Sequence, residues 1–149
     1  MTLSGLVNTD LIIIKSKCAS KNELIQELLE QIYKFGLEPP FPMNEVLKKI
    51  SIREEIGGTL FPVGLSIPHA RLQNYESFVI ALGVPSEPIL HNGIYLKLMA
   101  LMISSQSGGL YYLPTLAELT KLSRDSEFFP RLCSAENSEE FVRIIKERD

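Results

Sequence analysis

The spacing of apolar residues predicts one amphipathic helix clearly, between residues 20 and 36. Ser20 opens a capping box, in which its side-chain oxygen accepts from the backbone N–H of Glu23 and Glu23 reaches back. Apolar residues then recur at helical intervals, at Leu24, Ile25, Leu28, Leu29, Ile32 and Phe35. Gly36 follows where glycine commonly ends a helix, so the segment has both a start and a stop signal.

Four further helices are indicated more briefly. One begins near Asn44, ends around Arg53 or Glu55, and turns three apolar residues inward, namely Val46, Leu47 and Ile50. Another follows Tyr112, allows Pro114 in its first turn, and is defined by Leu113, Leu116, Ala117, Leu119 and Leu122. A short helix is expected over residues 128–132. The last begins at the capping sequence Asn137-Ser138-Glu139-Glu140 and buries Phe141, Ile144 and Ile145.

Short apolar runs predict strands at residues 11–14, 65–67, 77–84 and 94–104. Pro62 makes residues 59–63 a loop or an edge strand, because proline cannot donate to a sheet. Pro68 disfavours helix for Ile67, which places His69 at or just past a strand end. We therefore expect an α/β fold, a three-layer sandwich with a mixed sheet of four to five strands and helices on both faces, in a single domain over residues 1–149.

Composition and charge narrow the function classes. The 149 residues carry a net charge of −3, and the basic residues are spread along the chain, which argues against a nucleic-acid partner. Cys18 and Cys133 are far apart and only two histidines are present, so neither a metal site nor a cofactor is expected. The N-terminus does not look like a signal peptide, and no run is long and apolar enough for membrane insertion, so a cytoplasmic location is expected.

The chemistry is concentrated in residues 53–71, Arg-Glu-Glu-Ile-Gly-Gly-Thr-Leu-Phe-Pro-Val-Gly-Leu-Ser-Ile-Pro-His-Ala-Arg. This segment, and above all its Gly-Leu-Ser-Ile-Pro-His-Ala end, resembles the enzyme IIA family of the sugar phosphotransferase system, of fructose, mannitol and nitrogen-regulatory type. Looser similarity runs from Leu11 to Ile145. A free-standing IIA favours the nitrogen-regulatory subgroup by analogy.

The resemblance implies that His69 accepts a phosphoryl group from an HPr-type phosphohistidine carrier, on Nε2, and relays it or signals by it. An imidazole with an ordinary pKa of about 6.5 offers a neutral nucleophilic nitrogen near neutral pH. Arg53 and Thr59 match the family's phosphoryl-binding positions, where a guanidinium fork and a hydroxyl can bind oxygens. This chemistry requires that one edge of the His69 imidazole lies open to solvent beside a cation, so we expect an exposed ring in a shallow pocket.

Two departures from the family pattern stand out. Many members have a second histidine at the start of the helix after the central strand, and this chain has Tyr112 there. A phenol can donate a hydrogen bond to a phosphoryl oxygen but cannot become a cation. The usual small loop after the threonine is replaced by Leu60-Phe61-Pro62-Val63, which is bulkier and alters the surface on which a partner would dock.

Three functions remain open at this point. The first is a phosphocarrier, whose partners would be an HPr-type carrier and a regulated protein or a downstream IIB domain; whether it counts as an enzyme is left open. The second is a regulatory binding module with weak or no transfer, which the two departures motivate. The third, a hydrolase with His69 as base, ranks last because no nucleophile motif is evident.

Overall fold

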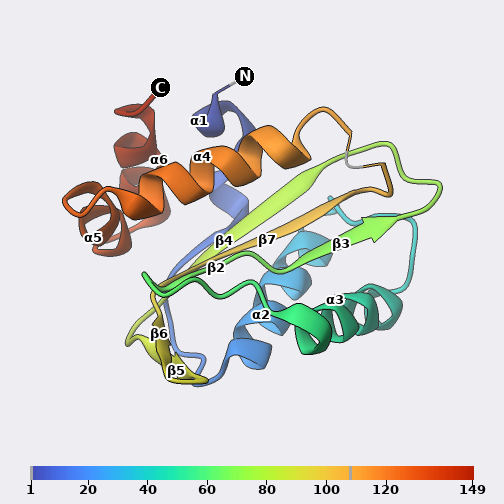
Figure 1. The fold of residues 1–149 in the computed structure, drawn as a ribbon. Helices are drawn as coiled ribbons and strands as arrows, with labels where there is room; N and C mark the ends of the chain where they lie inside the picture. Colours follow the sequence, from blue (N-terminus) through green and yellow to red (C-terminus); the bar gives the residue numbers. More distant parts are fainter. Residues whose placement is uncertain (1, 108) are drawn as a thin grey trace.

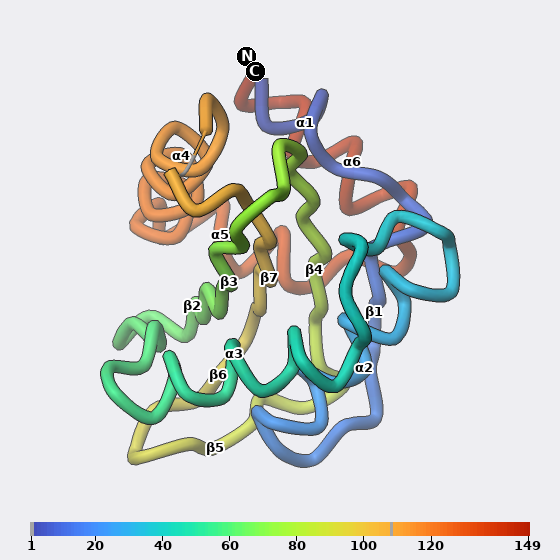
Figure 2. The backbone as a smooth tube through the Cα atoms, turned by 90° about the vertical axis from the view of Figure 1, so that its right-hand side faces the viewer, coloured from blue at the N-terminus to red at the C-terminus, as the bar shows by residue number. Residues whose placement is uncertain are grey.

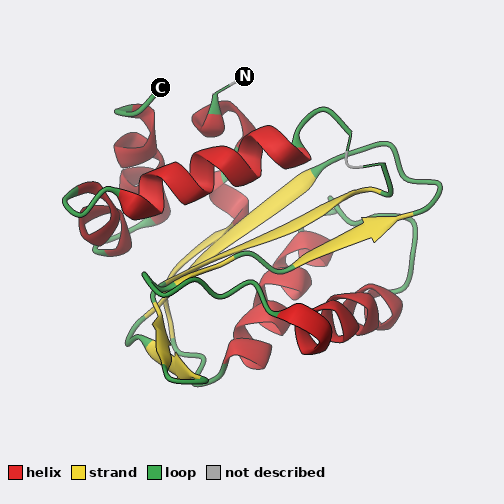
Figure 3. Ribbon diagram, in the orientation of Figure 1, coloured by secondary structure: helices red, strands yellow, loops and turns green. Residues whose placement is uncertain are grey.

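In the computed structural model, which describes residues 2–107 and 109–149, a five-stranded mixed sheet lies between two layers of helices (Figures 1 and 3). Its order is β1–β4–β7–β2, and β3 also pairs with β7. The strands span Ile12–Ser16 (β1), Val79–Pro85 (β4), Leu98–Ser105 (β7), Leu65–Ser66 (β2) and His69–Leu72 (β3). Strand β7 is antiparallel to β4 and parallel to β2 and β3. The predicted fold class is confirmed.

Helices α2 and α3 cover one face of the sheet, and a second group covers the other (Figure 2). The first layer consists of α2 (Lys21–Lys34) and α3 (Met43–Gly57). The second contains α1 (Leu3–Leu6), α4 (Tyr112–Arg124), α5 (Phe128–Cys133) and α6 (Ser138–Lys146). A 3-10 turn, Thr9–Leu11, precedes β1. The two ends of the chain meet where Ser4 hydrogen-bonds to Asp149. In the described part of the chain, no helix is long and apolar enough to cross a bilayer.

The burial of the residues in β7 shows why the sheet has helices on both sides. All eight of its residues are buried. Leu98, Ala100 and Met102 belong to the core beneath α4, whereas Met99, Leu101 and Ile103 belong to the core above α2 and α3. Alternate side chains of a strand point to opposite faces, so an unbroken apolar run requires two covered faces.

The capping sequences form helix starts as predicted. The hydroxyl of Ser20 accepts from the N–H of Glu23 at 3.1 Å, and the carboxylate of Glu23 accepts from the N–H of Ala19 at 3.0 Å. Asn137 caps α6 by accepting from the N–H of Glu140 at 2.8 Å. These local bonds satisfy backbone donors that a helix start leaves free.

Two of the apolar residues at helical spacing are exposed, and one helix end differs from the prediction. Phe35 caps the C-terminus of α2 and is 42% exposed, and Leu113 lies in the predicted helix α4 but is 68% exposed. Helix α3 continues to Gly57, past its predicted end at Arg53 or Glu55. Its last turn is held because the carboxylate of Glu54 bonds to both Lys21 and Thr59.

The predicted strand over residues 94–104 is two strands. Its first part, β6 (Ile94–Leu96), forms a separate hairpin with β5 (Ile89–His91), and the sheet strand β7 begins only at Leu98. The carbonyl of Gly64 accepts from the N–H groups of both Lys97 and Leu98, at 2.7 and 3.1 Å. This contact turns the chain between the two strands and fixes the loop that leads to β2.

Gly64 occupies a position that no other residue fits. Its φ is +104°, and an added Cβ would lie 2.6 Å from the carbonyl oxygen of Tyr95. Both the backbone conformation and the close approach therefore demand glycine. The loop between α3 and β2 depends on this residue.

We predict that Gly64→Ala lowers the free energy of unfolding by at least about 2 kcal/mol, because it adds both backbone strain and overlap. Gly57→Ala is the matched control: an added Cβ at that last helical residue meets nothing within 4 Å, so stability should be unchanged or slightly raised. Urea unfolding of both variants measures the difference. Equal stabilities would contradict the assignment of Gly64.

Candidate functional site

His69 is the first residue of β3, at the edge of the sheet. The sequence placed it at or just past a strand end; it does lie past β2, but it also starts a new strand. Pairing resumes there because Pro68, which lacks a donor, still accepts from the N–H of Met102 at 3.0 Å. His69 lies opposite Met102 in the register, so its side chain points to the α4 face.

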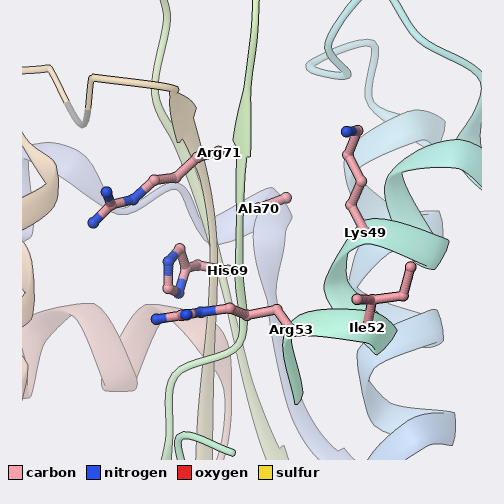
Figure 4. Close-up of a pocket in the computed structure, with 6 residues that line it drawn as sticks. All are labelled: Lys49, Ile52, Arg53, His69, Ala70 and Arg71. Carbon is pink, nitrogen blue, oxygen red and sulfur yellow. The ribbon is translucent and has the colours of Figure 1, made fainter. Parts of the chain in front are cut away.

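A cavity of about 430 Å³ gives access to His69. His69 as a residue is only 5% exposed, so the expectation of a ring open to solvent is wrong. The cavity rather than the open surface is the route by which a reactant meets the ring. The residues that line it come from α3 and β3, namely Lys49, Ile52, Arg53, His69, Ala70 and Arg71 (Figure 4). Three of the six are cations and none is an acid, so the cavity is suited to an anion.

The three cations are placed by simple periodicities. Lys49 and Arg53 are four residues apart on α3 and therefore lie on one face of that helix. Arg71 is two residues after His69 on β3 and therefore lies on the same face of the strand. In Figure 4 the imidazole lies between the guanidinium groups of Arg53 and Arg71.

Tyr112, the first residue of α4, contacts the histidine ring from the helical layer. Its hydroxyl lies 3.3 Å from Nε2 of His69, and the two ring centroids are 5.0 Å apart. Arg71 stacks on the ring of Tyr112, with its guanidinium carbon 4.5 Å from the centre of that ring. His69, Tyr112 and Arg71 thus form one contiguous group.

The pKa of His69 is lowered below its ordinary value, chiefly because burial disfavours the charged ring. The positive charges of Arg53 and Arg71 act in the same direction, whereas Glu54 and a backbone hydrogen bond to Ile67 act in the opposite one. The ring is therefore neutral at neutral pH and has a free nitrogen lone pair.

Thr59 does not line the cavity. Its hydroxyl donates to the carboxylate of Glu54 at 3.1 Å and accepts from the N–H of Ile67 at 3.2 Å. Glu54 in turn forms an ion pair of 2.7 Å with Lys21, and both side chains are buried. Thr59 thus ties the segment before His69 to the end of α3, the helix that carries Arg53.

Of the four residues singled out in the sequence, the structure brings His69, Arg53 and Tyr112 together and sets Thr59 behind them. Sequence reasoning assigned no role to Lys49, Arg71 or the pair of Lys21 and Glu54. The spacing of Lys49 from Arg53, and of Arg71 from His69, was a usable signal once helix and strand were known. Nothing in the sequence indicated that Lys21 meets Glu54, because the contact joins two helices.

Comparison with known proteins identifies the family of the chain. A family model described as "Phosphoenolpyruvate-dependent sugar phosphotransferase system, EIIA 2" matches residues 5–148. The chain therefore belongs to the EIIA type-2 family of that phosphotransferase system.

Two relatives and one solved structure illustrate the similarity. The chain is 24% identical to a nitrogen regulatory protein of Bradyrhizobium diazoefficiens, over 97% of this chain and 95% of that protein. It is also 24% identical to the 2-O-alpha-mannosyl-D-glycerate-specific EIIABC component of Escherichia coli. That match includes 99% of this chain but only 23% of the much longer relative. The fold matches enzyme IIAMTL in its complex with phosphorylated enzyme IIBMTL from Escherichia coli, with a TM-score of 0.75 and 17% identity, covering 95% of this chain and 98% of that chain.

We predict that His69 makes the protein less stable in mild acid. Its folded pKa lies below the unfolded value of about 6.5, so the unfolded state binds more protons between the two values. The stability is complete above about pH 6.5 and is lost as the pH falls toward the folded pKa. Urea unfolding at about pH 7.5 and about pH 5.5 should therefore show a larger loss for the wild type than for His69→Gln.

His91 also has a lowered pKa, from burial and from Lys21, so His69→Gln keeps the part of the pH dependence that His91 contributes. The difference between the two proteins isolates His69. Identical losses in wild type and His69→Gln would show that the ring is not held neutral by its surroundings.

We predict that Lys21→Met destabilises the protein by about 3–5 kcal/mol, because it leaves the buried carboxylate of Glu54 without its cation. The double variant Lys21→Met/Glu54→Gln should recover part of that loss, since no buried charge remains. Lys121→Met is the control; this lysine is 66% exposed, and the change should cost at most about 1 kcal/mol. A double variant as unstable as the single one would argue against this account of the pair.

Proposed function

We propose that the chain is a phosphoryl carrier in which His69 accepts a phosphoryl group from an HPr-type phosphohistidine carrier. The observation that supports this most is a neutral imidazole bordering a cavity lined by three cations and no acid. A neutral nitrogen is the nucleophile, and the cations offset the charge that arrives on it. Membership of the EIIA type-2 family points to the same chemistry.

In the proposed step, Nε2 of His69 attacks the phosphorus while the phosphorus–nitrogen bond of the donor breaks. The donor ring, protonated on its other nitrogen, keeps the electron pair of that bond and leaves as a neutral imidazole. The product ring of His69 then bears the phosphoryl group. Such a transfer depends mostly on positioning and charge stabilisation, because little proton movement is needed.

Each predicted site residue takes a part in this proposal. Arg53 binds phosphoryl oxygens with its guanidinium fork. Tyr112 lies where the family has its second histidine; its hydroxyl, 3.3 Å from Nε2, moves from the nitrogen to a phosphoryl oxygen when the group arrives. Thr59 acts through position, because its bonds to Glu54 and Ile67 hold the segment that leads into His69.

We further propose that this single domain works in the cytoplasm and passes the group to a IIB domain or uses it to regulate another protein. The IIB partner is suggested by the complex that the IIAMTL structure contains, and the regulatory role by the similarity to nitrogen regulatory proteins. Ile52, which is 47% exposed and lines the cavity, provides an apolar contact beside the reacting nitrogen for such a partner. The alternative, a binding module without transfer, gains no specific support from this cavity, because mere binding does not require a neutral ring among cations.

The proposal predicts phosphorylation at one histidine only. Incubation with phosphoenolpyruvate, enzyme I and HPr should yield an acid-labile, base-stable phosphoprotein, which His69→Gln abolishes. His91→Gln is the matched control; this residue lies in the β5–β6 hairpin, outside the cavity, and its variant should react like the wild type. Arg53→Gln should slow the transfer about 100-fold while leaving the fold intact, because one charged donor is lost. A wild-type protein that takes up no phosphate would contradict the proposal.

A further inference from the structure

We propose that Arg71 is a second phosphoryl-binding residue, and that Tyr112 holds it in place. This inference rests on the proposed function, because it concerns the same phosphoryl group on His69. The geometry assigns Arg71 and Tyr112 a joint role: the arginine provides charge, and the phenol fixes that charge relative to Nε2 of His69.

The backbone of β3 places Arg71 beside the reacting ring. His69 pairs with Met102 and Arg71 with Ser104 in the parallel register with β7, so both side chains leave the strand on one face. Both residues also line the same cavity. An edge strand with regular pairing is a rigid support, so the spacing between the imidazole and the guanidinium is set by the sheet.

The ring of Tyr112 connects the two side chains. Its hydroxyl is 3.3 Å from Nε2, and its face lies 4.5 Å from the guanidinium carbon of Arg71. Tyr112 is buried, whereas Arg71 is exposed. A cation over an aromatic face is attracted to it, and the planar guanidinium keeps its donors free at the edge. The stack therefore orders a side chain that would otherwise move freely in solvent.

Arg71 is available for an anion. Within residues 2–107 and 109–149, no carboxylate lies within 4.0 Å of its guanidinium, whereas Arg131, Arg143 and Arg148 each pair with an acid. Arg53 reaches the cavity from α3 and Arg71 from β3, on either side of the imidazole (Figure 4). A phosphoryl group carries a charge approaching −2 at neutral pH, which two guanidinium groups match.

The test uses phosphoramidate, a small phosphoryl donor that needs no docking partner. Its monoanion has a protonated nitrogen, ⁺H₃N–PO₃²⁻. Nε2 of His69 bonds to the phosphorus while the phosphorus–nitrogen bond breaks, and ammonia leaves with the electron pair of that bond and needs no further proton. We expect Arg71→Gln to slow phosphorylation about 100-fold, because a charged donor is lost. We expect Tyr112→Leu to slow it at least about tenfold, because both the ring that holds Arg71 and a neutral donor are lost. Arg143→Gln, which changes an exposed arginine of α6, is the control and should react like the wild type. Thermal unfolding verifies that the variants are folded.

Moving the positive charge from position 71 to position 112 separates an electrostatic role of Arg71 from a role in packing. In Arg71→Gln/Tyr112→His, a histidine beside His69 can replace the missing cation, but only when protonated. Relative to the wild type at the same pH, we expect partial recovery at about pH 6 and none at about pH 8, since the ordinary pKa of histidine is about 6.5. A merely structural role of Arg71 would produce no such pH dependence.

Four results would overturn the inference. Phosphorylation of Arg71→Gln within about threefold of a reactive wild type would remove Arg71 from the chemistry while leaving the proposed function intact. An unchanged rate in Tyr112→Leu, or a double variant that recovers equally at both pH values or at neither, would contradict the joint role. If the wild type is phosphorylated neither by phosphoramidate nor by phospho-HPr, the proposed function fails together with the inference.

Discussion

The proposed function requires two negative charges to be accommodated at a nitrogen that the protein almost entirely covers. His69 is 5% exposed, so a phosphoryl group bound there loses part of its hydration. Desolvating an anion is costly unless fixed positive charge replaces the water. The cavity meets this requirement with side chains from two different elements, Arg53 from α3 and Arg71 from β3. The same charges help to keep the unphosphorylated imidazole neutral, because they lower the pKa of His69.

The positions of these cations depend on contacts that lie outside the cavity. Lys21, at the start of α2, pairs with Glu54, the residue next to Arg53, and Glu54 accepts from Thr59. Thr59 then accepts from the backbone of Ile67, two residues before His69. One buried ion pair thus links α2 and α3 to the segment that leads into His69. Its value is positional, because buried ion pairs contribute little net stability but are costly to break.

Much of the fold could be predicted from local patterns. The capping residues Ser20 and Asn137 form the expected bonds, because a helix start is decided by the few residues around it. The split between β6 and β7 could not be predicted from the apolar run alone. It depends on the carbonyl of Gly64, a residue far earlier in the chain, which bonds to Lys97 and Leu98. Leu113 satisfies the helical spacing yet is exposed, since periodicity does not say which side of a helix meets the sheet.

In the site, too, local sequence patterns predicted some features, whereas others depend on contacts between distant parts of the chain. The Pro-His motif indicated His69, and the family resemblance added Arg53 and Tyr112, each of which lies beside His69 in the structure. In the sequence, Arg71 is only a basic residue two positions after the histidine. Its place beside His69 follows from β3, which continues through both residues. Thr59 was predicted to bind the phosphoryl group. The bonds of its hydroxyl to Glu54 and Ile67 could not be predicted, because only the tertiary fold creates them.

The account is tested most directly by nitrogen NMR of the arginine side chains before and after phosphorylation of the protein labelled with ¹⁵N. The central claim is that charge from α3 and β3 converges on one phosphoryl group bound to Nε2 of His69. It predicts a phosphorus–nitrogen coupling at that Nε2 and large shifts of the Nε–H resonances of both Arg53 and Arg71, with Arg143 unmoved. A phosphorylated protein in which the resonances of Arg53 and Arg71 stay where they were would contradict it.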